Sequence, residues 1–218
     1  MEKLSSMKKV SIILAFSFLV IFLSSCLRTL HPIFTSKDIV YEPKLIGSWK
    51  TGNLEKNRFA TISNLSTDNS IELPDKISSI KQKGYLVTYQ DEDGKATEQY
   101  IAFLARIGKH LYFDYFPADK KDSKTIDEFF TSHFIKMHTS YRVDISKDGS
   151  FELSQLDESY VTKLINEKKI RISHENANGI IVITASTDEL QQYIIKYGDE
   201  PGAYRSEKAV FTKTIHDL

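Results

Sequence analysis

The sequence predicts one α+β domain, in which two helices pack on a curved antiparallel β-sheet or partial barrel. Three observations lead to this fold class. Apolar and polar residues alternate with a period of two in the middle of the chain, turn-forming residues separate the alternating runs, and two later segments have helical spacing instead. Because the chain of 218 residues has no Pro-, Gly- or Ser-rich linker after its N-terminal part, residues 36–218 are expected to form a single globular domain.

An antiparallel meander is expected first along the chain. Residues 85–90 alternate as a strand does, and Asp93-Gly94 supplies a tight turn because this pair tolerates a positive φ. The return strand is expected over residues 99–107. Gly108 then turns the chain into a third strand over residues 111–116.

The run from Phe134 to Ile145 has the clearest period of two. One face of this strand would hold Ile135, Met137, Thr139, Tyr141, Val143 and Ile145. The other face would hold Lys136, His138, Ser140, Arg142 and Asp144. We therefore expect a sheet with one buried face and one solvent-facing side here. Later strands are expected over residues 151–153, 169–174, 179–185 and 208–215.

Two helices are expected among these later strands. The first lies near residues 157–167, where apolar residues recur at helical spacing. The second lies near residues 187–197, because Ser186 and Glu189 form a capping-box pattern at its start. Gly198 is expected to end this helix in the left-handed conformation that favours glycine.

The N-terminus has the parts of a secretory signal over residues 1–25. Basic residues precede an uncharged run from Val10 to Leu23, and small residues lead to Cys26. The run is shorter than the roughly 20 apolar residues that span a membrane. We therefore expect this segment to be cleaved and not to remain as a membrane helix.

Leu23-Ser24-Ser25-Cys26 resembles the lipobox of bacterial lipoproteins. The resemblance implies cleavage before Cys26 and attachment of acyl chains such as palmitate to its sulfur. Residues 26–35 would then be a lipidated N-terminus and tether. Two or more acyl chains anchor a protein stably, so the membrane would be reached through Cys26 alone. Leu27, where an Asp would favour inner-membrane retention, implies by the same resemblance the outer membrane, facing the periplasm.

Two further resemblances concern the mature chain. Gly47-Ser48-Trp49 resembles the Gly-x-Trp start of lipocalin-like barrels, which implies a lipocalin-like meander with the Trp plugging the narrow end. The basic residue that usually packs on that Trp would be Arg205 or Lys213, and an ordinary core role for Trp49 stays open. Residues 30–35 and 183–187 are similar to an uncharacterised group of Gram-negative lipoproteins, which carries no activity to transfer.

Composition and motifs indicate little catalytic chemistry. The formal net charge is +0 and there is no basic run, so no nucleic-acid partner is expected. No metal or other cofactor is expected, because no zinc-binding or phosphate-binding motif occurs. The histidines considered as metal ligands are His110, His133, His138 and His174. Asp114, on an aromatic strand, either marks a site by a raised pKa or pairs with a neighbour.

Aromatic residues concentrate in the predicted meander. If the sheet curls, they would line an apolar pocket, and if the helices cover them they are core. The candidate pocket residues are Trp49, Tyr85, Tyr89, Phe103, Phe113 and Tyr115. The sequence therefore favours a lipid-anchored envelope lipoprotein, not an enzyme, that acts as a binding or interaction module for an unidentified protein partner. A carrier of a small apolar ligand and an envelope hydrolase are the alternatives.

Overall fold

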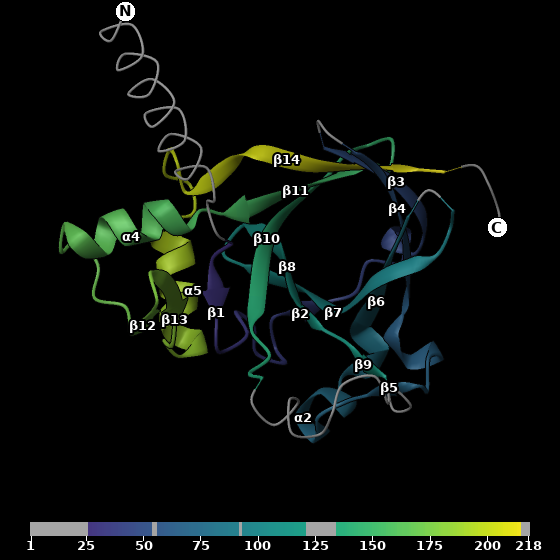
Figure 1. Cartoon of the computed structure of the whole chain (residues 1–218), viewed down its shortest axis with the longest axis horizontal. Helices are drawn as coiled ribbons and strands as arrows, with labels where there is room; N and C mark the ends of the chain where they lie inside the picture. Colours follow the sequence, from purple (N-terminus) through teal and green to yellow (C-terminus); the bar gives the residue numbers. More distant parts are fainter. Residues whose placement is uncertain (1–25, 54–55, 92, 121–133, 215–218) are drawn as a thin grey trace, which may run out of the picture.

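The computed structural model describes residues 26–53, 56–91, 93–120 and 134–214 (Figure 1). The predicted signal segment 1–25, including Leu23, Ser24 and Ser25 of the lipobox pattern, lies outside the described residues, as does His133. Within the described residues, no helix is long and apolar enough to cross a membrane.

An eight-stranded antiparallel barrel forms the centre of the molecule (Figure 1). Its strands are β3 (Gly47–Asn53), β4 (Lys56–Asn64), β6 (Gly84–Gln90), β7 (Ala96–Ile107), β8 (His110–Pro117), β10 (His138–Ile145), β11 (Phe151–Leu156) and β14 (Tyr204–Lys213). Each strand pairs with the next one in this order, and β14 pairs with β3. The predicted barrel-like sheet is therefore confirmed, but the barrel is closed and not partial.

Closure depends on one long-range pairing, in which Lys213 lies opposite Trp49. Strands twist naturally, so a meander of this length curls until its first and last strands meet. The closed barrel leaves no edge among its own strands for pairing with another chain. Local patterning contains no signal for this pairing, which explains why the sequence predicts a partial barrel.

A second layer covers one side of the barrel. The helices α4 (Glu158–Asn166) and α5 (Thr187–Tyr197) pack there with strands β1 (Arg28–Thr29), β12 (His174–Ala177) and β13 (Ile180–Ile183), which continue the sheet from β10 (Figure 1). Shorter elements complete the fold. They are β2 (Ile39–Val40), η1 (Pro43–Leu45), η2 (Leu65–Thr67), β5 (Ile71–Glu72), α2 (Asp75–Ser78), η3 (Lys81–Lys83) and β9 (Asp119–Lys120).

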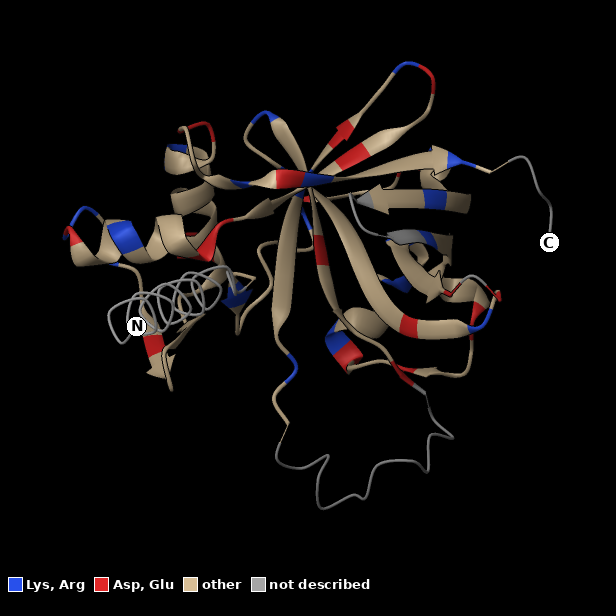
Figure 2. Cartoon of the chain, turned by 45° about the horizontal axis from the view of Figure 1, so that its top comes forward, with Lys and Arg blue, Asp and Glu red and all other residues tan. Residues whose placement is uncertain are grey.

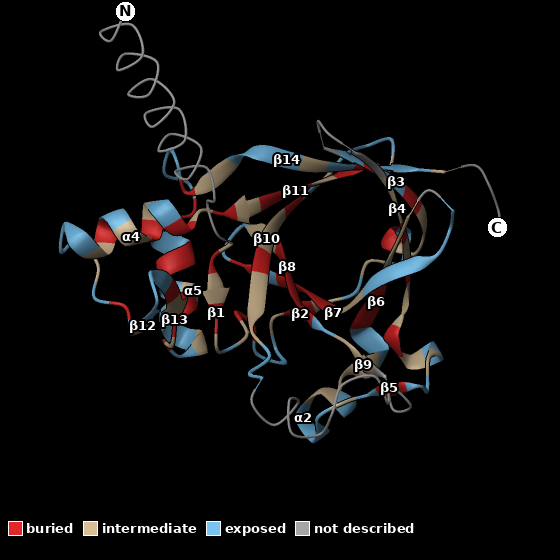
Figure 3. Ribbon diagram, viewed as in Figure 1, coloured by how far each residue is buried: buried red, intermediate tan, exposed pale blue. Residues whose placement is uncertain are grey.

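The molecule has two apolar cores, because the barrel wall is buried on both sides where the second layer covers it (Figure 3). The inner core fills the barrel, and its largest members are Trp49, Tyr85, Phe113, Phe151 and Phe211. The outer core lies between the barrel wall and the second layer, and it includes Ile33, Phe34, Phe103, Tyr112 and Tyr193.

Both predicted helices are present, and the capping box of Ser186 and Glu189 is formed. The prediction for Gly198 was wrong, because its φ is −68°. A Cβ at this position would lie 2.5 Å from the backbone oxygen of Ile194 and 3.2 Å from the hydroxyls of Tyr112 and Tyr204. Glycine is therefore favoured chiefly because the Ile194 carbonyl of α5 itself lies too close for a Cβ, and the two tyrosine hydroxyls of the barrel wall leave little further room.

Two predicted strands begin later than expected. The strand predicted from Phe134 starts at His138, and Phe134 itself is 68% exposed. Its predicted solvent face was wrong in part, because the second layer covers Ser140, which is 3% exposed. The strand predicted over 169–174 is replaced by β12, which begins at His174, so residues 169–173 form a connecting segment.

Residues 27–34, which the sequence predicts to be part of a tether, pack into the outer core. Ile33 is fully buried, and Phe34 stacks at a tilt on Phe103 with ring centroids 5.2 Å apart. Two side chains of helix α5 bind this segment. Thr187 donates a hydrogen bond to the backbone oxygen of Pro32, and Gln191 donates one to the backbone oxygen of Ile33. The chain after Cys26 is thereby fixed to the barrel wall.

Candidate ligand site at the tyrosine end of the barrel

One end of the barrel is closed by an aromatic plug, which we call the Trp49 end. Trp49 is fully buried, and its indole N–H donates to the backbone oxygen of Leu45 at 3.0 Å. Phe151 meets the Trp49 ring edge-on at 4.8 Å and stacks on Phe211 at 4.5 Å. Each polar atom of the plug thus has a partner, and the plug is a filled core.

The start of β3 explains the Gly47-Ser48-Trp49 pattern. Gly47 has φ +140°, which an L side chain rarely adopts, so the strand can begin there only with glycine. The ammonium of Lys213 lies 5.4 Å from the Trp49 ring centroid. Arg205 instead reaches the other end of the barrel, where it donates to the Gln155 side chain at 3.5 Å. Lys213 is therefore the basic residue that packs on the Trp.

Four tyrosines meet inside the opposite end, which we call the tyrosine end. They are Tyr89 on β6, Tyr100 on β7, Tyr115 on β8 and Tyr141 on β10. Neighbouring rings meet edge-on, with centroids 6.1 Å apart for Tyr89 and Tyr100, 6.1 Å for Tyr100 and Tyr115, and 5.4 Å for Tyr115 and Tyr141. Because side chains alternate along a strand, each of these four strands directs one tyrosine ring into this end of the barrel.

The four tyrosines are held in the neutral, hydrogen-donating form. Burial raises the pKa of Tyr141 to about 12, and the neighbouring Cys26 adds to this shift. Burial also raises the pKa of Tyr115 well above its ordinary value, and the facing hydroxyls of Tyr89 and Tyr141 reinforce the effect. A neutral phenol donates a hydrogen bond to a carbonyl or carboxylate oxygen.

Two buried donors at this end have no acceptor among the described residues. Neither the side-chain nitrogen of Gln155 nor the hydroxyl of Tyr115, which the Tyr89 hydroxyl faces, forms a hydrogen bond of normal geometry with a described residue. A buried polar atom left unpaired costs roughly 1–3 kcal/mol, so native proteins rarely keep one without a reason. Water or a ligand in the barrel would supply the missing acceptor.

Charged residues form the rim of the tyrosine end. The guanidinium of Arg58 lies 4.7 Å from the Tyr89 ring centroid and 3.3 Å from the Glu98 carboxylate. The hydroxyl of Tyr100 donates to Glu98 at 3.1 Å. These contacts fix the orientation of two of the four rings, and they place a cation and an anion beside them.

Cys26 lies at the same end. It forms an isolated β-bridge with Asp157, directly after the end of β11. It is close enough to Tyr100 and Tyr141 to contribute, after burial, to the raised pKa of each hydroxyl. The residue that carries the predicted lipid is therefore a neighbour of the tyrosine cluster.

The six predicted pocket residues do not all come together. Five belong to the inner core or pack against it, namely Trp49, Tyr85, Tyr89, Phe113 and Tyr115. Phe103 faces the outer core, because it has the opposite parity on β7 from Tyr100. Sequence reasoning missed Tyr100, Tyr141, Gln155 and Arg58, which the barrel closure brings to the tyrosine end.

Asp114 lies on the outer side of the barrel wall. Its fully buried carboxylate accepts the backbone N–H of Ile33 at 2.9 Å and contacts Nδ1 of His138 at 2.5 Å. Of the two roles considered for Asp114, the structure favours pairing with a neighbour. Asp114 and His138 therefore connect the N-terminal segment to the outer side of the barrel wall. Their side chains lie outside the barrel and not at the tyrosine end.

The other described histidines are separate from one another. His110 pairs with Asp199 at 2.8 Å, and Nδ1 of His174 contacts the backbone oxygen of Ile172 at 2.8 Å. In the part of the chain that the structure describes, no three His, Cys, Asp or Glu side chains form a group that could hold a metal ion. Figure 2 shows basic and acidic residues interspersed over the surface and not segregated into two faces.

Comparisons with known proteins identify no relative. No protein-family model matches the chain, and neither the curated proteins nor the solved structures contain a match.

Proposed function

We propose that this chain is a lipid-anchored envelope lipoprotein that binds, without catalysis, a small and largely apolar molecule at the tyrosine end of its barrel. The observation that carries the proposal is a pair of buried donors inside that end, Tyr115 and Gln155, that have no acceptor among the described residues. A ligand that accepts hydrogen bonds from them would remove the cost of leaving them unpaired.

The chemistry of the site favours an amphipathic ligand. Tyrosine rings offer large apolar faces, and their neutral hydroxyls favour a carbonyl or carboxylate oxygen over a cation. Arg58 at the rim is already paired with Glu98, so the tyrosine hydroxyls are the groups that would recognise the oxygen of the ligand. A fatty acid or a related lipid fragment combines both properties.

The position of Cys26 supports a function at a membrane. Acyl chains on Cys26 would hold the tyrosine end beside the lipid surface, because Cys26 neighbours Tyr100 and Tyr141. A ligand could then pass between the membrane and the barrel over a short path. We expect cells fed radiolabelled palmitate to label the native protein and not a Cys26→Ala variant. Equal labelling of both, or no labelling, would contradict the anchor.

Binding is tested with cis-parinaric acid, a fluorescent fatty acid, and residues 26–218 purified without lipid. Trp49 is the only tryptophan and lies inside the same barrel, so a bound probe should accept energy from it. We expect saturable energy transfer that weakens about tenfold in Tyr115→Phe, which removes one donor and keeps the ring. A probe that does not bind, or that binds both proteins equally, would argue against this site.

A further inference from the structure

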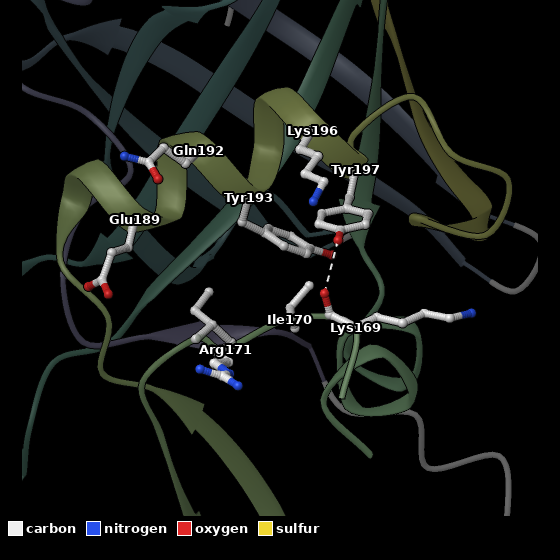
Figure 4. A pocket seen from close by; sticks show the side chains of 9 residues that line it. Lys169, Ile170, Arg171, Glu189, Gln192, Tyr193, Lys196 and Tyr197 are labelled. Atoms are coloured by element: carbon white, nitrogen blue, oxygen red, sulfur yellow. Dashed lines mark hydrogen bonds between the residues drawn. The ribbon is translucent and has the colours of Figure 1, made fainter. Parts of the chain in front are cut away.

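A concave site lies outside the barrel, between α5 and residues 169–172 (Figure 4). The groove has a volume of about 270 Å³. Three basic residues line it, of which Lys169 and Arg171 belong to the connecting segment and Lys196 to the helix. Glu189 supplies the one carboxylate among its lining residues.

The charges in this groove are unbalanced. Glu189 is engaged at the start of α5, where its carboxylate accepts from the backbone and the hydroxyl of Ser186 at 2.9 and 2.8 Å. Lys169 already pairs with Glu167 at 2.7 Å. Arg171 and Lys196 are both exposed, and neither forms an ion pair with any residue that the structure describes. Two cations thus line the groove without a counter-ion among the residues that the structure describes.

Aromatic rings form part of the groove wall. Tyr193 and Tyr197 stack with centroids 5.6 Å apart and an interplanar angle of 28°. The hydroxyl of Tyr197 donates to the backbone oxygen of Lys169 at 3.2 Å, which ties the helix to the connecting segment (Figure 4). The groove is therefore held open between two walls that are fixed to each other.

We propose that this groove binds a phosphate ester of a compact polar molecule, such as a sugar phosphate or a phospholipid headgroup. The planar guanidinium of Arg171 can pair with two phosphate oxygens, and Lys196 supplies a point charge. The rings of Tyr193 and Tyr197 contact the carbon skeleton of the ester. The proposal does not depend on the ligand of the barrel.

The location is compatible with either source of phosphate. Helix α4 begins beside Asp157, the bridge partner of Cys26, and its 9 residues span about 14 Å before the chain reaches the groove. A lipid surface that held Cys26 would therefore be near the groove. A soluble sugar phosphate would reach it from solvent.

Calorimetric titration of the purified full chain in a non-ionic detergent separates these sources. The probes are inorganic phosphate, glucose 6-phosphate and a short-chain phosphatidylglycerol, with glucose as the uncharged comparison. We expect the phosphate esters to bind and glucose not to bind, and the tighter ester identifies the source. The absence of binding by every phosphate probe would overturn the proposal.

Three variants test the residues, and a fourth is a matched control. Arg171→Gln and Lys196→Gln should each weaken ester binding about tenfold. Glu189→Gln should strengthen it about twofold, because glutamine keeps the capping box and removes the carboxylate. The control is Lys147→Gln, which makes the same charge change in the exposed turn between β10 and β11. This variant should leave ester binding unchanged. Equal weakening by Lys147→Gln, or none by Arg171→Gln, would also overturn the proposal.

Discussion

The two ends of the barrel interior are both aromatic, but they differ in how their polar atoms are satisfied. At the Trp49 end, the indole N–H has a backbone acceptor and the Phe151 and Phe211 rings stack closely. At the tyrosine end, Tyr115 and Gln155 keep buried donors that no described residue satisfies. The first end has the properties of a structural plug, whereas the second keeps buried donors that no described residue pairs with.

The comparison shows that aromatic content alone does not identify a ligand site. Burial stabilises an apolar ring wherever it occurs, but an unpaired buried donor costs stability unless something else binds it. Substitutions at the Trp49 end should therefore change stability most. Substitutions at the tyrosine end should change binding most.

The largest effect is expected for Trp49→Ala. Removing this fully buried ring leaves a cavity between Phe151 and Leu45, which should lower the free energy of unfolding by about 4 kcal/mol. Urea denaturation followed by circular dichroism measures this free energy, because the variant has no tryptophan fluorescence to follow. A loss below about 1 kcal/mol would show that this end is not a packed plug.

The second-largest effect is expected at alkaline pH, which should lower the free energy of unfolding by ionising a tyrosine at the tyrosine end. The pKa of Tyr141 is about 12 in the folded protein, against 10.0 ordinarily. Because the folded state holds this proton more tightly, its stabilising contribution is complete below pH 10 and is lost as the pH rises through about 12. We expect the ionisation of Tyr141 to account for a loss on the order of 2 kcal/mol, measured as the difference between the native protein and a Tyr141→Phe variant in urea unfolding across this range.

The control for this pH dependence is Tyr141→Phe. Phenylalanine keeps the ring but has no proton to lose, so the variant should lose less stability than the native protein over the same range. Identical pH profiles would show that Tyr141 does not contribute to the alkaline transition.

A matched pair of Tyr→Phe substitutions compares a paired hydroxyl of the inner core with an unpaired one at the tyrosine end. Tyr85→Phe removes a hydroxyl that accepts from the backbone of Glu42 at 2.7 Å, so it should cost about 1 kcal/mol and leave parinaric acid binding unchanged. Tyr115→Phe removes an unpaired hydroxyl, so it should cost nothing or stabilise slightly while binding weakens. The opposite pattern would reverse the assignment of the two ends.

The smallest effect is expected for Lys213→Met. This change removes the ammonium above the Trp49 ring and keeps an apolar chain of similar length, so it should cost about 0.5 kcal/mol. The difference in urea midpoint from the native protein measures it. A cost above about 2 kcal/mol would mean that Lys213 has a role beyond packing on the ring.

Local patterns predict much of the fold. The period of two indicates the strands of the meander, and the capping box of Ser186 and Glu189 locates α5 correctly. Barrel closure could not be predicted in this way, because it joins Trp49 and Lys213, which lie far apart in the sequence. The burial of Ser140 could not be predicted either, because an alternating strand pattern does not show which elements will pack on its polar face.

The candidate site could be predicted only in part. Strand β7 is buried on both faces where it crosses the two cores, so hydropathy does not distinguish the face of Phe103 from that of Tyr100. Tyr89 and Tyr115 were therefore grouped with Phe103, and Tyr100 was left out. Gln155 gave no signal at all, because a single polar residue near a strand end is ordinary.

Native mass spectrometry of residues 26–218 tests the tyrosine end most directly. The protein is incubated with cis-parinaric acid beside a Tyr115→Phe, Gln155→Leu double variant, which lacks both unpaired donors. We predict one bound probe on the native domain and none on the variant under the same conditions. A native domain that stays empty, or a variant that retains the probe equally, would contradict a ligand site at this end.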